Sequence, residues 1–209
     1  VDAALACERV GEAEVLWHGA ADLKGVDAIV VPGGFSYGDY LRVGAIARFA
    51  PVMESVIAFA RDGGPVLGIC NGFQVLCEAG LLPGALLPNQ GLRFVCRQVD
   101  LVVGTADTPW SGACTAGDVL SIPAKHTTGR YYAPEAVLDE LDAEHRVLVR
   151  YAPGENFNGS LRDIAGVVGE GRNVVGLMPH PEHAVDPLTG SDDGLRLFES
   201  AALAAGVVV

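Results

Sequence analysis

A cysteine flanked by glycines is the residue of this chain that is best placed to act as a nucleophile. Gly68-Ile69-Cys70-Asn71-Gly72 follows a short apolar run and precedes a segment with helical spacing. The two glycines let the backbone turn sharply and leave room around the side chain at the apex. Because Cys70 would end a strand and begin a helix, the positive end of the helix dipole favours its thiolate form. The alternative is that Cys70 is only a small buried hydrophobic residue.

A histidine and a carboxylate two residues apart could supply the base. Met178-Pro179-His180-Pro181-Glu182 follows the last predicted strand, and in extended backbone residues two apart point to the same side. The two prolines stiffen the segment, so Glu182 can orient the imidazole of His180, which could then take a proton from a thiol. His183 lacks such a carboxylate partner and is the weaker candidate. The alternative is a surface loop with a chance histidine and glutamate.

A glycine-rich turn is the third candidate. Pro32-Gly33-Gly34-Phe35-Ser36-Tyr37-Gly38-Asp39-Tyr40 follows another predicted strand, and backbone N–H groups in such a turn could stabilise an oxyanion. It is not a P-loop, because the Lys-Ser/Thr pair is missing; an ordinary turn is the alternative. Each motif alone is a weak signal. Together they are stronger, since an α/β sheet places its chemistry at the carboxyl ends of its strands.

The composition limits the class of protein. The chain has 209 residues, half of them hydrophobic, which is enough for one domain over residues 1–209. Its net charge is -12 and its 14 Lys and Arg are scattered, which argues against a nucleic-acid partner. We expect a cytoplasmic protein without a membrane partner, because no apolar run approaches the roughly 20 residues of a membrane span and the start does not resemble a signal peptide. The five cysteines lack zinc or disulfide spacing, so no metal is expected, and all but Cys70 are assigned to packing.

Alternating strand and helix patterns predict an α/β domain with a mixed, mostly parallel sheet flanked by helices. The last two strands should form a hairpin through Gly169-Glu170-Gly171-Arg172. No strand precedes the first helix. Helices are predicted at 2–10, 43–61 with an interruption at Pro51, 71–79, 134–141 and 193–204, and strands at 14–17, 28–31, 66–70, 92–103, 119–122, 146–151, 164–168 and 174–178.

The three motifs resemble the signatures of class I glutamine amidotransferases, which have a flavodoxin-like fold. The similarity extends over nearly the whole chain, and the run over residues 33–40 is most similar to the glutaminase subunits of phosphoribosylformylglycinamidine synthase. The resemblance implies that Cys70 attacks the side-chain amide of glutamine, that His180 acts as base and then as acid, and that Glu182 orients His180. It also implies an oxyanion site formed by backbone N–H groups of Gly34 or Phe35 and of Asn71. Glutamine would be bound by Gln74 and by the backbone around Asn158, Gly159 and Ser160.

The same resemblance implies a complex. Ammonia would pass to a large PurL-like synthetase subunit, which converts formylglycinamide ribonucleotide to formylglycinamidine ribonucleotide in de novo purine biosynthesis. A small PurS-like subunit is expected to bridge the two. ATP and magnesium would belong to the synthetase, with no cofactor in this chain.

Three features depart from the family pattern. The first strand and a Pro-Gly-Ser-like turn are missing before the first helix, Lys125-His126-Thr127-Thr128-Gly129-Arg130 replaces a His-Gly-Glu-Gly-Arg run, and His183 stands where arginine often follows. Two other readings compete with the amidotransferase: a hydrolase or stress-response protein with the same elbow cysteine, and a non-catalytic partner-binding subunit. The presence of Gln74 and of the His-Pro-Glu motif favours the amidotransferase over both.

Overall fold

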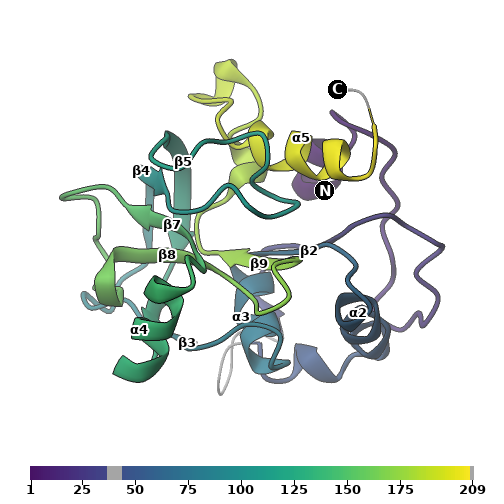
Figure 1. The fold of residues 1–209 in the computed structure, drawn as a ribbon, viewed down its shortest axis with the longest axis horizontal. Coiled ribbons are helices and arrows are strands. Elements are labelled where there is room, and N and C mark those ends of the chain that lie inside the picture. The colour runs from purple at the N-terminus through teal and green to yellow at the C-terminus, as the bar shows by residue number, and fades with distance from the viewer. Residues whose placement is uncertain (37–43, 208–209) are drawn as a thin grey trace.

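Strands rich in valine, isoleucine and leucine build the main sheet of the computed structural model, which describes residues 1–36 and 44–207. The sheet has seven strands in the order β1-β2-β9-β8-β7-β4-β5, and a second sheet pairs β3 with β6. Figure 1 shows the main sheet running across the molecule. Its strands are β1 (Ile29–Val31), β2 (Val66–Ile69), β9 (Val174–Leu177), β8 (Ile164–Val168), β7 (Val147–Tyr151), β4 (Val95–Val103) and β5 (Val119–His126).

Parallel pairing is confined to one end of the main sheet. β1 with β2 and β2 with β9 are parallel, whereas the other four pairings are antiparallel. The predicted mixed α/β sheet is therefore confirmed, but its parallel share is smaller than expected. The reason is that β8 and β9 are joined by the predicted hairpin turn, and β4 and β5 by a loop without a helix, and such connections favour antiparallel neighbours.

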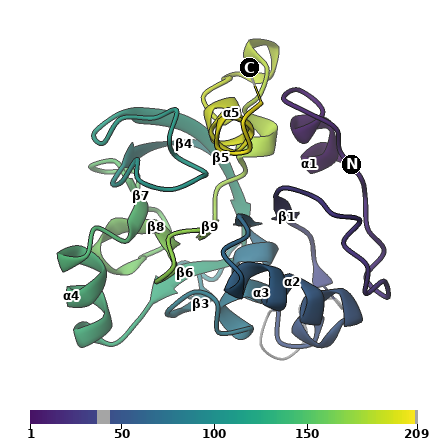
Figure 2. The ribbon, with the colours of Figure 1, turned by 45° about the vertical axis from the view of Figure 1, so that its right-hand side comes forward.

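Helices cover the parallel strands on both faces. In Figure 1, α3 (Asn71–Glu78) lies below β2 and β9 and α5 (Leu195–Ala204) lies above them. α1 (Asp2–Cys7) lies beside α5, as Figure 2 shows. Every residue of β2, β8 and β9 is buried, as expected for strands covered on both faces. The remaining helical elements are α2 (Pro51–Arg61), α4 (Glu135–Ala143), η2 (Ala47–Phe49), η3 (Leu161–Asp163), η4 (Pro181–His183) and η5 (Pro187–Thr189).

Two parts of the predicted element order are wrong. The segment 14–17 forms no strand; Val15 and Trp17 are 79% and 70% exposed, and no strand of the described chain offers this backbone a ladder. Conversely, β3 (Ala85–Pro88) and β6 (Thr128–Tyr132) were not predicted. They are short, and β3 ends at a proline while β6 begins Thr-Gly-Arg, residues that are poor strand signals.

The N-terminus of α3 packs closely on the end of β1. A Cβ atom at position 72 would lie 1.8 Å from the carbonyl oxygen of Val31, and one at position 68 would lie 2.8 Å from the backbone nitrogen of Phe73. Real Cβ atoms do not approach other heavy atoms so closely. Both glycines around Cys70 are therefore required for the approach of helix to strand.

Gly72→Ala should accordingly destabilise the protein by about 1–3 kcal/mol or more, because the added methyl group forces the helix away from β1. Urea unfolding followed by circular dichroism measures the change. Gly112→Ala is the matched control, since its Cβ would lie 3.7 Å from the nearest atom, an ordinary contact. Equal stability of the two variants would show that α3 can shift without cost.

Candidate active site

Cys70 occupies a sharp turn between β2 and α3. Its backbone has φ 50° and ψ −104°, a conformation that costs a residue other than glycine about 1–3 kcal/mol. Hydrogen bonds on both sides hold it there: the N–H of Cys70 donates to the carbonyl of Leu177 at 2.8 Å, and the N–H of Gln74 donates to the carbonyl of Cys70 at 3.2 Å. The predicted strand–turn–helix around this cysteine is confirmed.

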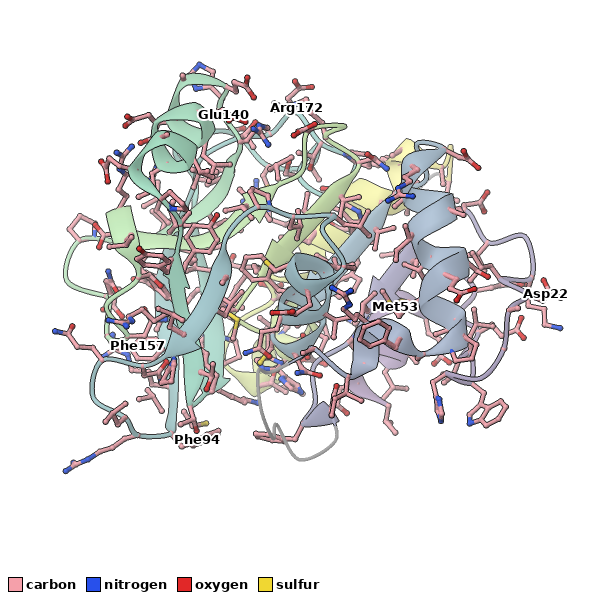
Figure 3. All side chains as sticks on the ribbon, turned by 90° about the horizontal axis from the view of Figure 1, so that it is seen from below. Asp22, Met53, Phe94, Glu140, Phe157 and Arg172 are labelled. Atoms are coloured by element: carbon pink, nitrogen blue, oxygen red, sulfur yellow. The ribbon has the colours of Figure 1, made fainter. Side chains whose placement is uncertain are left out.

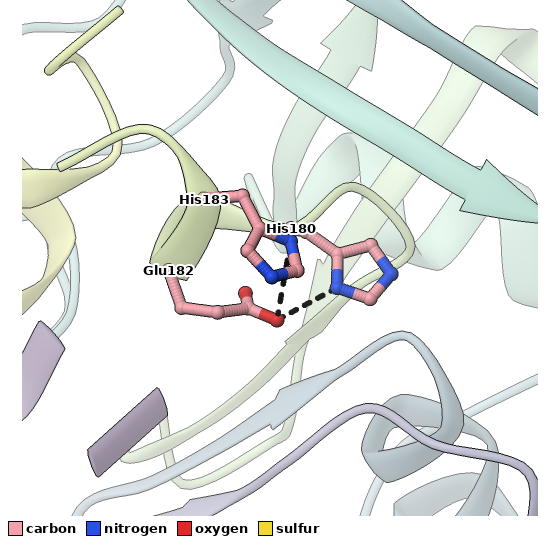
Figure 4. A group of neighbouring side chains, drawn as sticks. All are labelled: His180, Glu182 and His183. Atoms are coloured by element: carbon pink, nitrogen blue, oxygen red, sulfur yellow. Dashed lines mark hydrogen bonds and ion pairs between the residues drawn. The ribbon is translucent and has the colours of Figure 1, made fainter. Parts of the chain in front are cut away.

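His180 and Glu182 form a buried pair (Figure 4). Nδ1 of His180 lies 2.7 Å from Oε1 of Glu182, and the two side chains are only 9% and 5% exposed. The backbone N–H of His180 donates to the carbonyl of Pro123 at 2.8 Å, which fixes the segment against the edge of β5. Nε2 of His180 is buried and has no hydrogen-bond partner within the described part of the chain. This free nitrogen is the one that can exchange a proton with a thiol or a substrate.

The surroundings of His180 favour its protonated form. Burial alone would lower the pKa of His180, but the neighbouring Cys70 and the carboxylate of Glu182 outweigh it and raise the pKa to about 10. An imidazolium at this place stabilises negative charge on a nearby sulfur. The Cys70 sulfur itself makes a long contact, 3.9 Å, with the carbonyl oxygen of Lys125.

Cys70 and His180 line one cavity of about 660 Å³ together with the glycine turn. A Cβ atom at Gly33 would lie 2.8 Å from Cε1 of His180 and 3.6 Å from Cβ of Cys70, so this glycine lies against both residues. Gly34 and Phe35 also line the cavity, while residues 37–40 of the motif lie outside the described residues. Phe94, at the edge of the molecule in Figure 3, is exposed and lines the same cavity. The structure thus brings nucleophile, histidine and glycine turn together.

A chain of side-chain hydrogen bonds connects the glycine turn to the helix of the elbow. Ser36 Oγ bonds to Oδ1 of Asn71, and Nδ2 of Asn71 donates to Oε1 of Gln74 at 3.0 Å. Nε2 of Gln74 then donates to the carbonyl of Thr128 at 2.7 Å. Gln74 lines the cavity, but its amide is committed to these bonds. Its main effect in this structure is to join α3 to β6.

Asn158, Gly159 and Ser160 do not line this cavity. Nδ2 of Asn158, a fully buried residue, donates to the carbonyl of Gly129 at 2.9 Å, and the N–H of Tyr131 donates to Oγ of Ser160 at 3.0 Å. These two bonds attach residues 158–160 to the backbone of β6 at Gly129 and Tyr131. The predicted contact between the backbone of residues 158–160 and glutamine stays a prediction.

The sequence did not assign Lys125, His126, Thr127 and Thr128 to the site, yet all four line the cavity. His126 is buried, and Oδ1 of Asn89 lies 3.0 Å from its Nδ1. Burial, together with the positive charge of His180, lowers the pKa of His126 to about 4, so its imidazole is neutral at pH 7. One signal could have pointed to them, namely the strand that leads into this segment. That strand was predicted to end at Ile122, whereas β5 ends at His126 and so carries the chain into the cavity wall.

The ligand atoms of His180, Glu182 and His183 lie within 4.8 Å of one another, a spacing that could suit a metal ion. Their ring nitrogens are mostly engaged, however. His183 meets Lys125 Nζ at Nδ1 and Asp2 at Nε2, and Glu182 holds Nδ1 of His180. The cluster therefore forms a hydrogen-bond network in which, among the described residues, Nε2 of His180 and Oε2 of Glu182 have no hydrogen-bond partner. Separately, no helix in the described ranges is long and apolar enough to cross a membrane.

Comparison with known proteins identifies the family. The model of the CobB/CobQ-like glutamine amidotransferase domain matches residues 2–202. Phosphoribosylformylglycinamidine synthase subunit PurQ of Rubrobacter xylanophilus is 63% identical over 99% of this chain and 93% of its own length, and PurQ of Mycobacterium bovis is 64% identical over 96% and 90%. The structure of PurLQS from Thermotoga maritima matches with a TM-score of 0.88 and 43% identity, covering 98% of this chain and 92% of that one. The resemblance read from the motifs is confirmed: this chain belongs to the glutamine amidotransferase family and, within it, to the PurQ subunits of phosphoribosylformylglycinamidine synthase.

Proposed function

We propose that the chain is the glutaminase subunit of a phosphoribosylformylglycinamidine synthase and hydrolyses glutamine to glutamate and ammonia. The observation that carries this is the cavity shared by Cys70, on its strained turn, and the His180–Glu182 pair with its 2.7 Å contact. Membership of the PurQ family supports the substrate. Residues 1–209 would act together as one glutamine amidotransferase domain.

In this reaction the Cys70 sulfur attacks the side-chain amide carbon of glutamine. Before the attack His180 has taken the thiol proton, so that a thiolate faces an imidazolium; His180 then gives this proton to the leaving ammonia, which leaves a glutamyl thioester on Cys70. Water activated by His180 hydrolyses the thioester to glutamate and free thiol. Glu182 orients and stabilises the imidazolium, and the backbone N–H groups of Gly34 or Phe35 and of Asn71 bind the oxyanion.

Ammonia would then pass to a larger PurL-like subunit, which uses ATP and magnesium to convert formylglycinamide ribonucleotide to its amidine, with a PurS-like subunit bridging the two. The name of the Thermotoga maritima assembly, PurLQS, supports this set of partners. The chain needs no cofactor of its own for glutamine hydrolysis, because a thiol and an imidazole supply the nucleophile and the proton transfers. We place the complex in the cytoplasm, where purine biosynthesis and its nucleotides would be found.

Cys70→Ala should abolish glutamine-dependent synthesis by the assembled complex and leave ammonia-dependent synthesis intact, because only the ammonia supply needs the thiol. Both rates are measured by product formation. Cys96→Ser, a change at an exposed cysteine, is the control and should keep both activities. A glutamine analogue that alkylates should modify Cys70 alone, as peptide mass spectrometry would show. Loss of the ammonia-dependent rate in Cys70→Ala would instead indicate a structural role.

Glu182→Gln should move the alkaline limb of kcat/KM for glutamine to lower pH. The carboxylate stabilises the imidazolium of His180 and so raises its pKa; a neutral amide removes that contribution, and the imidazolium is lost at a lower pH. Turnover should fall, while thioester formation, trapped by acid quench, should persist. An unchanged alkaline limb would show that Glu182 does not act on the charge of His180.

A further inference from the structure

Glutamine carries an α-carboxylate that the triad does not touch. A carboxylate taken from water into a cavity needs a cation or several hydrogen-bond donors to offset its desolvation. Among the described residues that line the cavity of Cys70, the lysine or arginine side chain present is that of Lys125. The other charged side chains of this lining are two carboxylates, Asp2 and Glu182, and the histidines.

The ammonium of Lys125 makes no direct ion pair with a carboxylate in the described structure, although, after the hydrogen bond from His183 as the main cause, its charge helps to lower the pKa of Asp2. Its Nζ lies 3.1 Å from Nδ1 of His183, which accepts the hydrogen bond. Nε2 of His183 is then the donor to Asp2, at 2.8 Å. Since Glu182 holds His180, both carboxylates of the cavity wall are already engaged by histidines. Lys125 is thus a half-buried cation held by a neutral ring.

A cation in the neighbouring cavity is committed elsewhere. Arg97 lines a neighbouring cavity of about 500 Å³, which also contacts Lys125 and His183, but Arg97 is not in the lining of the cavity of Cys70. Its guanidinium lies 2.5 Å from the carboxylate of Glu155. Of the two cations, only Lys125 is available to an incoming anion.

Lys125 is also at the right place along the chain. Its carbonyl oxygen contacts the Cys70 sulfur at 3.9 Å, so the residue flanks the nucleophile. The amide carbon of a glutamine side chain is separated from the carbon of its α-carboxylate by four bonds, on the order of 5 Å. The four-carbon stem of lysine is flexible enough to follow a carboxylate over such a distance.

We propose that Lys125 binds the α-carboxylate of glutamine and so makes the site selective for the free amino acid. The inference rests on the proposed function. It assigns a role to one residue of the segment 125–130, which departs from the pattern of related amidotransferases.

The test uses the assembled complex and Lys125→Met, which keeps the length of the side chain and removes its charge. kcat/KM for glutamine should fall roughly 10- to 100-fold, the range for losing a hydrogen bond to a charged group, and mostly through KM. Lys125→Arg should recover part of the loss. Lys24→Met is the matched control, because Lys24 is exposed and pairs with Asp22; its kinetics should equal those of the wild type.

Two competitive inhibitors identify the group that Lys125 recognises. Glutaramate is glutamine without its amino group, and 4-aminobutanamide is glutamine without its α-carboxylate. Lys125→Met should weaken inhibition by glutaramate by the same factor as kcat/KM and leave inhibition by 4-aminobutanamide unchanged. The unchanged inhibitor also reports that the cavity is still folded.

Other outcomes overturn the inference. Equal weakening of both inhibitors would mean that Lys125 acts by positioning the site, and His183→Gln should then reproduce the effect. No weakening of glutaramate would mean that another group binds the carboxylate. These results would leave the proposed glutaminase function in place, whereas a wild-type complex without glutaminase activity would overturn both.

Discussion

The strained turn at Cys70 is the constraint on which the rest of the site depends. A cysteine with φ 50° is strained, and it keeps this conformation only if its contacts with the surrounding structure stabilise it by more than the strain costs. Here the surroundings are the buried β2, its parallel neighbours β1 and β9, and a helix that can begin at once because residues 68 and 72 have no side chain. The turn places the sulfur of the buried Cys70 on the cavity wall at the carboxyl end of the strand, where the other catalytic groups can reach it.

The base arrives at this place through backbone hydrogen bonds. β9 pairs with β2 and ends at Leu177, whose carbonyl receives the N–H of Cys70. The chain then runs three residues further to His180, whose own N–H is held by Pro123 on the last strand of the sheet. Nucleophile and base are therefore fixed by the same sheet, and the Glu182 contact only has to set the orientation of the ring. Because the sheet sets the position of His180 and Glu182 sets only its orientation, a motif of five residues is enough for the proton transfer.

The sequence predicted best what is local. Cys70, His180 and Glu182 each lie in a motif of five residues next to a buried strand, and turn chemistry is enough to recognise the cysteine turn. The pairing of His180 with Glu182 was predicted from an extended backbone, whereas residues 181–183 form the 3-10 helix η4, which still brings the two side chains together. The sequence failed where the deciding partner is distant in the chain. β3 and β6 become strands only through each other. Segment 14–17 has the residues of a strand but no described neighbour to pair with. The sequence showed Lys125 only as part of a segment that departs from the family pattern. A role for it could not be predicted, because that role depends on the cavity that it lines.

The distribution of charge around the cavity follows from its surroundings. A chain with a net charge of -12 gives an anion no general attraction, and exposed charges farther away than about 8 Å are largely screened at physiological ionic strength. The charge that an anionic group meets is therefore set by its nearest neighbours. Burial keeps His126 neutral, whereas Cys70 and Glu182 keep His180 positive beside the sulfur. Lys125 adds a second cation next to Nδ1 of His183. Positive charge is thus concentrated where a thiolate and a carboxylate would lie. His126 carries none, because a charge on its ring would be repelled by the charge on His180.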